Sequence, residues 1–534
     1  MRRCLVCILA VAATASTVAA RDQPPEIVRR YLPSDCGRVS FRECADYGAD
    51  AYRLKVVNGR LEISGDAAGL VFGAYDALER FCGIRFLASD CDFVPKGASW
   101  RLPAKFDAIE RPAFAFRDAY WADAIKRPFA ERLRLNDSAR TSHANGWFCH
   151  TFGRLVPARR HFAENPEYFA LVAGKRRQDA QLCLSNPRVA ELARTALLEE
   201  IRRDGGRHSR FSVSQNDCNG FCECPQCQEQ RRKFGTSGYL LRFVNGIAEQ
   251  VAGSYPDVTV TTLAYMDTMA APVGVVPAKN VEIWLCFIDA DAAHPYADAA
   301  EDSSGRNARV RSALEGWGKV APGRIVIWDY TTAFKDYLCP YPNEATLAAN
   351  LRWFAKNGVC GVFSQGAYES PVADLSELKA YLISKLLWNP AADDKALTEE
   401  FVRLYYGEKA APSILEYLDY RRRYFENPKM TLHCIRANHG ALGVGDGFVR
   451  RSLELWRAAM SATENKAPYA ERVRRGALPS MLQAFTWPRP MEARKVLARD
   501  ILAALGENRN IVFKEWEKPE SWPLWAELKN AAAQ

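Results

Sequence analysis

The sequence lacks several features that would place it in a common functional class. After residue 20, no continuous apolar run reaches the ~20 residues that a membrane-spanning helix needs, so no membrane span is expected. There is no long block of lysine and arginine and no nucleic-acid-binding motif, which excludes nucleic acid as an expected partner. There is also no internal repeat and no low-complexity segment.

The overall composition is that of an ordinary globular protein. The chain has 534 residues, of which 48% are hydrophobic and 25% are charged. This length is enough for two or three domains with a large core. The net charge of +9, from 72 basic and 63 acidic residues, is small for this length. It indicates no specific partner, and the sequence gives no oligomeric state.

Residues 1–20 have the pattern of a secretory signal peptide. Arg2 and Arg3 form a basic start, residues 5–13 are apolar, and residues 18–20 are a small-residue cleavage site. The apolar stretch is too short for a membrane anchor. We therefore expect a soluble mature protein outside the cytoplasm, either secreted or periplasmic.

Three regions follow the signal peptide. Residues 22–106 predict a small α+β domain, because two strand-like runs flank Asn58-Gly59, the strongest short hairpin signal, and residues 69–81 have helical spacing and end before Gly83. Residues 110–390 alternate between strands and helices, and residues 391–534 predict a helical C-terminal region.

The alternation in the middle region favours a parallel sheet, and a (β/α)₈ TIM-like barrel of ~250 residues fits its length. A doubly wound sheet is the alternative, but no glycine-rich phosphate loop follows the first strand. Two strands between residues 125 and 205 are poorly defined, and residues 181–185 are one candidate. The expected strands are residues 113–117, 210–214, 258–264, 281–286, 324–328 and 361–364.

Polar and aromatic residues gather where these strands end, which is where a barrel enzyme builds its site. Tyrosine and tryptophan rings stack on sugar rings, while acids, amides, arginine and histidine bond sugar hydroxyls. This mixture predicts a carbohydrate substrate. The expected substrate-binding residues are Arg117, Asp118, Trp121, His143, Asn145, His150, Asn216, Tyr265, Asp267, Trp328, Asp329, Tyr330 and Gln365.

Glycosidic cleavage needs an acid on the leaving oxygen and a second carboxylate as base or nucleophile. Asp217 and Glu369 are the leading catalytic candidates, and Asp329 is the third. The alternative role for Asp217 is to cap the next helix. The alternative for Glu369 is that it is a solvated loop residue without a catalytic role. A hydrogen-bonding role is favoured for His143 and His150, because no third metal ligand is spaced with them.

Cysteines cluster directly after Asp217, at Cys218, Cys222, Cys224 and Cys227. They predict either a structural zinc site or disulfides that clamp the loop, and the secretory route favours disulfides or mixed use. No cofactor is required for the expected chemistry. Elsewhere, Cys36 with Cys44 and Cys82 with Cys91 are plausible local disulfide pairs.

Several motifs together resemble a bacterial family catalogued as domain of unknown function 4838. They cover roughly residues 110–410 and include Ser214-Gln-Asn-Asp217, the cysteine motif that follows it, Gln181-Leu-Cys-Leu-Ser-Asn-Pro187 and Trp328-Asp-Tyr330. Residues 69–79, followed by residues 83–86, look like a part of the small domain that precedes the barrel in α-glucuronidases and β-hexosaminidases, and this resemblance covers about residues 22–106. The resemblance implies a glycoside-hydrolase-like barrel behind an accessory domain.

One position departs from that pattern. Hexosaminidases place an Asp-Glu pair after the fourth strand, whereas this chain has Asn216-Asp217. We therefore expect a secreted glycoside hydrolase acting on a complex polysaccharide, with Asp217 as general acid and Glu369 as the partner carboxylate. A carbohydrate-binding protein without catalysis and a metal-dependent hydrolase that uses the cysteines are the alternatives.

Overall fold

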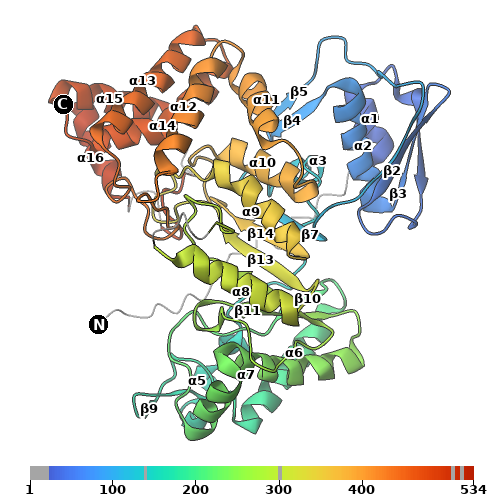
Figure 1. The fold of residues 1–534 in the computed structure, drawn as a ribbon, viewed down its shortest axis with the longest axis vertical. Coiled ribbons are helices and arrows are strands. Elements are labelled where there is room, and N and C mark those ends of the chain that lie inside the picture. Colours follow the sequence, from blue (N-terminus) through green and yellow to red (C-terminus); the bar gives the residue numbers. More distant parts are fainter. Residues whose placement is uncertain (1–22, 138–140, 299–303, 507–510, 518–521) are drawn as a thin grey trace.

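The computed structural model describes residues 23–137, 141–298, 304–506, 511–517 and 522–534. The expected signal peptide, residues 1–20, lies outside these described residues. An N-terminal domain and a group of C-terminal helices lie on opposite sides of the upper part of a central parallel sheet (Figure 1). Among the helices of the described ranges, none combines the length and the apolar character needed to cross a bilayer.

The N-terminal domain confirms the predicted hairpin and helix. Strands β2 and β3 pair antiparallel across Asn58 and Gly59, which both have positive φ, at 51° and 69°. Helix α2 begins after Asp66, whose side chain accepts a hydrogen bond from the Gly69 amide, and ends at Gly83 in the left-handed conformation. The elements are α1 (Pro24–Tyr31), β1 (Val39–Glu43), β2 (Tyr52–Val57), β3 (Arg60–Gly65), α2 (Ala67–Cys82), β4 (Arg85–Ala88), β5 (Cys91–Phe93) and β6 (Phe106–Glu110).

The central sheet has six parallel strands in the order β10-β11-β12-β13-β14-β7. Every residue of β7, β12, β13 and β14 is buried, as expected for a parallel sheet covered on both sides. The first strand in sequence, β7, pairs with the last, β14, so the sheet curls. The strands are β7 (Phe116–Tyr120), β10 (Arg210–Ser212), β11 (Thr259–Ala264), β12 (Val281–Cys286), β13 (Ile325–Tyr330) and β14 (Gly361–Gln365).

The described residues therefore form a curled half-barrel, and they do not confirm eight strands. No strand of the described residues joins the sheet between its edge strands β7 and β10. The Asp137 amide donates to the carbonyl of Arg117 on β7, and the Ala144 amide donates to that of Arg210 on β10. The expected strand at residues 181–185 is a loop with one isolated bridge, at Leu182. The expected strand at residues 113–117 lies three residues later in the structure.

Helices connect the strands at the expected places. Helix α7 begins at Pro225 and continues through a kink at Gly235, whose φ is 75°. The elements of this region are α3 (Phe129–Arg132), α4 (Phe152–Leu155), α5 (Ala158–His161), β8 (Leu171–Val172), β9 (Lys175–Arg176), α6 (Pro187–Asp204), α7 (Pro225–Ser254), α8 (Arg306–Val320), α9 (Glu344–Lys356) and α10 (Ser376–Trp388).

Aromatic rings fill the concave side of the curled sheet. Trp284 of β12 packs against Phe116 of β7 at 5.3 Å and against Phe148 at 5.1 Å between ring centroids. Trp328 of β13 contacts Phe148 at 5.0 Å and Phe363 of β14 at 5.1 Å. The interior is a packed core, so a ligand must bind above it, at the ends of the strands.

The C-terminal region is helical, as predicted, and one of its loops returns to the central sheet. The Tyr337 amide donates to the carbonyl of Phe513 at 2.8 Å, and the Glu515 amide donates to that of Phe334 at 3.0 Å. Residues 511–517 therefore lie beside the segment that follows β13. The helices are α11 (Asp394–Tyr406), α12 (Ala411–Phe425), α13 (Asp446–Ala462), α14 (Tyr469–Thr486), α15 (Met491–Leu505) and α16 (Pro523–Ala533).

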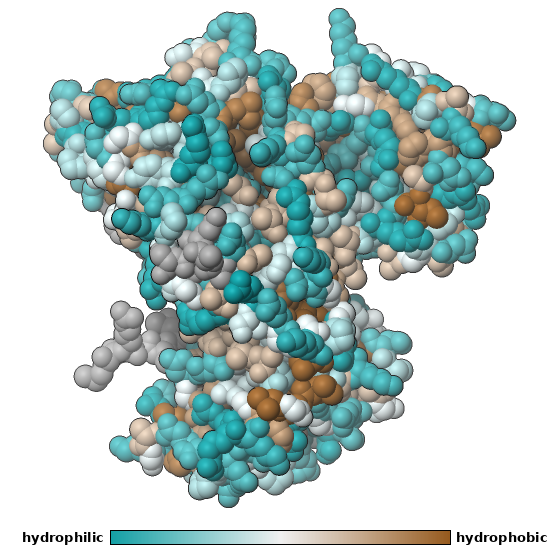
Figure 2. Space-filling view, in the orientation of Figure 1, coloured by the Kyte–Doolittle hydropathy of each residue, from teal (hydrophilic) through white to brown (hydrophobic). Residues whose placement is uncertain are grey.

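Ion pairs join the N-terminal domain to the rest of the chain. Glu79 of α2 pairs with Lys385 of α10, and Arg85 of β4 donates to Glu400 of α11 at 2.8 Å. These groups line a cavity of about 270 Å³ between the two regions. The surface seen in Figure 2 is mostly hydrophilic, with small scattered hydrophobic areas.

The two expected local disulfides are not formed. Cys36, Cys44, Cys82 and Cys91 are all thiols. The Cys36 thiol lies near the carbonyl of Pro33, at 3.5 Å. Burial raises the pKa of the Cys82 thiol to about 12. Closeness in sequence was the only basis for these pairs, and it does not fix where the side chains lie: Cys82 ends helix α2 and Cys91 begins strand β5.

Candidate active site

The candidate site lies at the carboxyl ends of the parallel strands, above the aromatic core. Successive side chains of a strand point to opposite sides of the sheet. On β13, Trp328 and Tyr330 therefore share the concave side, and their rings stack at 5.8 Å with planes 12° apart. On β14, Phe363 and Gln365 share that side. Tyr330 and Gln365 are the last residues of their strands, so they form the floor of the site.

Asp217 lies on the exposed loop after β10 and contacts the end of the neighbouring strand. The Tyr265 hydroxyl donates to Oδ1 of Asp217 at 3.2 Å. Burial raises the pKa of Tyr265 far above its usual range, and the charge of Asp217 adds to this. Tyr265 therefore remains a neutral donor. The ring of His150 meets that of Tyr265 edge-on at 6.0 Å, and its Nδ1 is 2.8 Å from the carbonyl of Gln215.

A second group of contacts centres on Gln365. The indole N–H of Trp328 donates to Oε1 of Gln365 at 2.7 Å, and this bond fixes the amide orientation. The other end of the amide then donates from Nε2 to Oε1 of Glu515 at 2.9 Å. Glu515 belongs to the returning C-terminal loop. A carboxylate is thus held above the end of β14 by a relay that begins in the aromatic core.

Glu369 and Trp516 meet at the same edge. The Trp516 amide donates to Oε2 of Glu369 at 3.0 Å, and the Trp516 indole N–H donates to the Tyr368 hydroxyl at 3.2 Å. Tyr368 stacks on Tyr120 of β7 at 4.5 Å between centroids. The Trp516 side chain is nevertheless 62% exposed. Its indole is therefore oriented by a hydrogen bond while much of its ring surface is open to solvent.

Burial and nearby groups raise the pKa values of two tyrosines at the strand ends. Burial raises the pKa of Tyr330 well above its usual range, and both Cys286 and Tyr265 add to that rise. Burial also raises the pKa of Tyr337, with Glu515 and Glu369 as the next contributions.

The loops above the strand ends form the rim of the site. Three residues of this rim have an unusual backbone conformation. His150, Met266 and Trp516 have positive φ values of 53°, 51° and 62°. This conformation is sterically unfavourable for residues with large side chains and costs about 1–3 kcal/mol for each. Strain of this kind gathers at sites where a side chain must be held in one orientation, and here it holds residues next to Asp217, Tyr265 and Glu369.

Some predicted site residues lie elsewhere in the structure. Arg117 is 0% exposed, points away from the concave side and pairs with Asp50 of the N-terminal domain at 2.9 Å. Asp329 also lies on the outer side of its strand, where it accepts a hydrogen bond from the Tyr296 hydroxyl at 2.9 Å. Both belong to the packing around the half-barrel.

Other predicted residues lie within the core or on the loops around the site. Asp118 is buried on the concave side of β7. His143 packs edge-on against Trp284 at 5.1 Å, inside the half-barrel. Trp121 is buried against Gly366. The side-chain amide of Asn216 donates to the carbonyl of Ala180 at 3.0 Å, so this side chain fixes the loop. Asn145 and Asp267 are exposed.

Sequence reasoning missed Glu515 and Trp516, which come from the region predicted only as helical. The signal was the acid-aromatic run Lys514-Glu-Trp-Glu517 between two helices. Glu515 and Gln365 are 150 residues apart in the sequence, so no local pattern links them.

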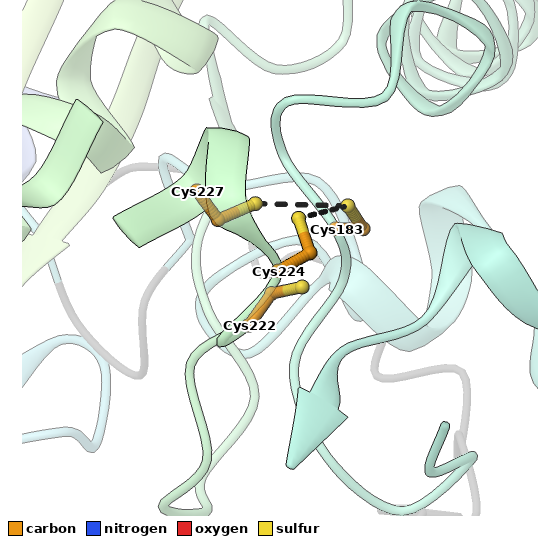
Figure 3. Close-up of side chains that lie close together, drawn as sticks. All are labelled: Cys183, Cys222, Cys224 and Cys227. Atoms are coloured by element: carbon orange, nitrogen blue, oxygen red, sulfur yellow. Dashed lines mark hydrogen bonds between the residues drawn. The ribbon is translucent and has the colours of Figure 1, made fainter. Parts of the chain in front are cut away.

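The cysteine cluster has a different membership from the one predicted. Cys183, Cys222, Cys224 and Cys227 are all buried, and their sulfur atoms lie within 4.8 Å of one another (Figure 3). Cys218 is not in this group. Its carbonyl accepts a hydrogen bond from the amide of Gln181 at 2.8 Å, and its sulfur lies 3.5 Å from the same nitrogen.

The sequence profile of one protein family matches this chain. The family is described as "Domain of unknown function (DUF4838)", and the match covers residues 86–419, which is more than half of the chain. No curated protein matches the sequence.

Several solved structures of glycoside hydrolases are weakly similar. A β-N-acetylhexosaminidase from Bacteroides fragilis is 10% identical, with a TM-score of 0.40, over 72% of this chain and 89% of the other. A GH20 exo-β-N-acetylglucosaminidase from Vibrio harveyi is 12% identical, with a TM-score of 0.38, over 72% and 71%. A GH138 enzyme targeting pectin rhamnogalacturonan II is 8% identical, with a TM-score of 0.35, over 87% and 85%. At these scores the similarity supports no functional conclusion.

Proposed function

The chain belongs to the DUF4838 family, whose description names no activity, and from the site itself we propose that the protein is a glycoside hydrolase. Its substrate is a complex polysaccharide or glycan outside the cytoplasm, and the protein is secreted or periplasmic. Two contacts at the strand ends carry this proposal. The Tyr265 hydroxyl donates to Asp217, and the backbone amide of the exposed Trp516 donates to Glu369.

The aromatic part of this rim suits a sugar ring. Trp516 is exposed, and its indole N–H is already bonded to Tyr368. Its ring can therefore stack on the C–H side of a pyranose without first losing rotamer freedom. Carboxylates and amides next to a ring are the usual partners of sugar hydroxyls, and Gln365 and Glu515 supply them here.

Two carboxylates at the rim can share the chemistry. Asp217 is exposed and is oriented by the Tyr265 hydroxyl. Its protonated form is proposed as the general acid that gives its proton to the leaving oxygen. The phenol then stabilises the carboxylate that remains after this transfer. Glu369 is proposed as the partner carboxylate that acts as base or nucleophile. Glu515 is the alternative partner, because the Gln365 amide holds it at the same edge. The variants Glu369→Gln and Glu515→Gln separate these two assignments.

The test is a screen of the purified chain against a panel of polysaccharides and glycans, with product release followed by mass spectrometry. Replacing Asp217 by Asn should lower turnover about 100-fold or more, since loss of general acid catalysis has effects of this size. The fold should persist, because Asp217 is exposed. Glu229→Gln, an exposed acid on α7, is the matched control and should retain full turnover.

Undiminished turnover by Asp217→Asn would remove Asp217 from the mechanism. Sugar binding without product from the wild-type chain would instead favour a carbohydrate-binding protein without catalysis. One observation favours this second candidate. Oε2 of Glu369 already accepts the Trp516 amide, so that oxygen must exchange this partner before it can act on a substrate.

A further inference from the structure

Four cysteine thiols from separate parts of the sequence converge at one buried point. Cys183 lies in the loop before α6, Cys222 and Cys224 lie in the loop after β10, and Cys227 lies in the first turn of α7. The sulfur of Cys183 is 3.6 Å from that of Cys227 and 3.8 Å from that of Cys224 (Figure 3).

We propose that these four thiolates bind one structural zinc ion. Zinc–sulfur bonds are about 2.3 Å long, so four sulfurs at the corners of a tetrahedron lie about 3.8 Å apart. The two separations from Cys183 match this edge length. A disulfide would bring two sulfurs to about 2.05 Å and leave the other two as a separate pair. Four sulfurs that all lie close to one another have the arrangement expected of ligands that share one ion.

Hydrogen-bond donors surround the cluster as they do in thiolate metal sites. The Leu171 amide donates to the sulfur of Cys222 at 3.3 Å, and a guanidinium N–H of Arg176 lies 3.7 Å from the same atom. The Tyr239 hydroxyl donates to the sulfur of Cys227 at 2.8 Å. These donors stabilise negative sulfur, and the charge of Arg176 offsets the net negative charge of a zinc ion with four thiolates.

The local structure brings the four ligands together. Pro225 begins α7, and Cys227 follows within the first turn, where the helix dipole favours a thiolate. Cys222 and Cys224 precede the helix, and Cys224 has an extended backbone at the helix N-cap. Cys183 is brought to them by the loop of residues 181–186. Sequence spacing alone would have chosen Cys218 as the fourth ligand.

The site is structural, because the protein supplies all four ligands and no coordination position stays open for water. Its position explains what it stabilises. The clustered cysteines join the loop before α6 to the loop that carries Asp217. Gln181 joins the same two loops, since its Oε1 accepts a hydrogen bond from the backbone amide of Asn216 at 2.9 Å. The inference is independent of the proposed hydrolase activity.

The test uses the full chain, expressed with its own N-terminal segment in zinc-containing medium and purified without chelators. Elemental analysis should find about one zinc ion per chain in the wild type and in Cys218→Ser, the matched control. Cys183→Ser should lose most of the metal. If Cys183→Ser does not accumulate as folded protein, a mercurial titration of the wild type should release the zinc as four thiols are bound.

Three outcomes would overturn the inference. The first is a wild-type chain without stoichiometric metal. The second is iron in place of zinc. The third is a disulfide among these four cysteines, found by peptide mass spectrometry of the unreduced protein. None of these measurements depends on enzymatic turnover, so a failure of the proposed activity leaves the metal inference unaffected.

Discussion

The Tyr265 hydroxyl donates a hydrogen bond of 3.2 Å to Oδ1 of Asp217, which joins the end of β11 to the loop after β10. This contact gives Asp217 an orientation although the residue is exposed. In the proposed hydrolase, Tyr265 is a positioning residue. Its replacement should affect the reaction through Asp217 and should have little effect on the fold.

Tyr265→Phe should lower kcat about tenfold and leave KM nearly unchanged, because a hydrogen bond to a charged group contributes about 1.5–3 kcal/mol when it is fully formed. Steady-state kinetics on the substrate found by the glycan screen measure both constants. The double variant Tyr265→Phe/Asp217→Asn is the control. It should be no slower than Asp217→Asn alone, because the phenol acts through the carboxylate. Additive losses would show that Tyr265 acts independently.

Trp516→Ala should raise KM about tenfold, because one aromatic stacking contact contributes about 0.5–1.5 kcal/mol beyond its buried area. The ring is 62% exposed, so the free energy of unfolding should change by less than about 0.5 kcal/mol. Isothermal titration with the substrate or its product measures the affinity. Trp516→Phe keeps a ring face and loses the hydrogen bond to Tyr368, so its affinity should be intermediate. An unchanged KM in the alanine variant would exclude stacking on this ring.

Asp329 predicts a specific dependence of stability on pH. Burial raises its pKa to about 6, while hydrogen bonds from Tyr296 and the Tyr330 amide oppose the rise. The folded chain therefore binds this proton more tightly than the unfolded chain, in which the pKa is near its ordinary value of ~3.9. Stability from this group is present below about pH 4, is lost between about pH 4 and pH 6, and stays lost at higher pH.

Asp329→Asn removes this titration and keeps an oxygen that can accept both hydrogen bonds. Its free energy of unfolding should exceed that of the wild type increasingly as pH rises, by up to about 3 kcal/mol above pH 6. Urea denaturation between about pH 4 and pH 8 measures the difference. A constant difference across this range would contradict a raised pKa at Asp329.

Asp374→Asn is the matched control, because Asp374 is also buried but its pKa is lowered and not raised. Burial alone would raise the pKa of Asp374, but the charges of Arg421 and Lys379, at 2.8 and 2.9 Å, outweigh burial and hold it well below its usual range. Neutralising this carboxylate leaves Lys379 without its ion-pair partner and leaves Arg421 paired with Glu344 alone. The variant should therefore lose about 3–5 kcal/mol of stability at neutral pH.

Gly366 gives a test of how tightly the rim is packed. A Cβ atom at this position would lie 2.0 Å from Cε2 of Trp121, whose ring is fully buried. Gly366→Ala should therefore destabilise the chain by at least about 1–3 kcal/mol. Gly246→Ala, in the exposed part of α7 with open space around the new carbon, should instead stabilise it by up to about 1 kcal/mol. Thermal denaturation of both variants measures the contrast.

Local patterns in the sequence predicted local structure well. Asn58-Gly59 specified the hairpin, and Gly83 specified the end of α2, because the residues that decide these features are neighbours in the chain. Strand limits were less accurate. The alternation of alanine and phenylalanine at residues 113–116 suggested an early strand, but pairing with β14 sets β7 at Phe116–Tyr120.

Tertiary structure decided which of the candidate residues lie together. Asp217 and Tyr265 were both chosen because each follows a strand, and parallel neighbouring strands bring their ends to one edge. Arg117 and Asp329 were chosen on the same ground, but each lies within its strand with its side chain on the outer side, a distinction that depends on register. A shift of one residue in the pairing of a strand moves each of its side chains to the opposite face of the sheet.

The sequence by itself determined the order of the elements, the helical C-terminal region and the candidate acid Asp217, since these depend on periodicity and on residues close together in the chain. Only the tertiary structure brought Cys183 to the other three thiols and Glu515 to Gln365. Such contacts depend on how whole helices and loops pack, and separations of 41 and 150 residues leave no trace in local sequence patterns.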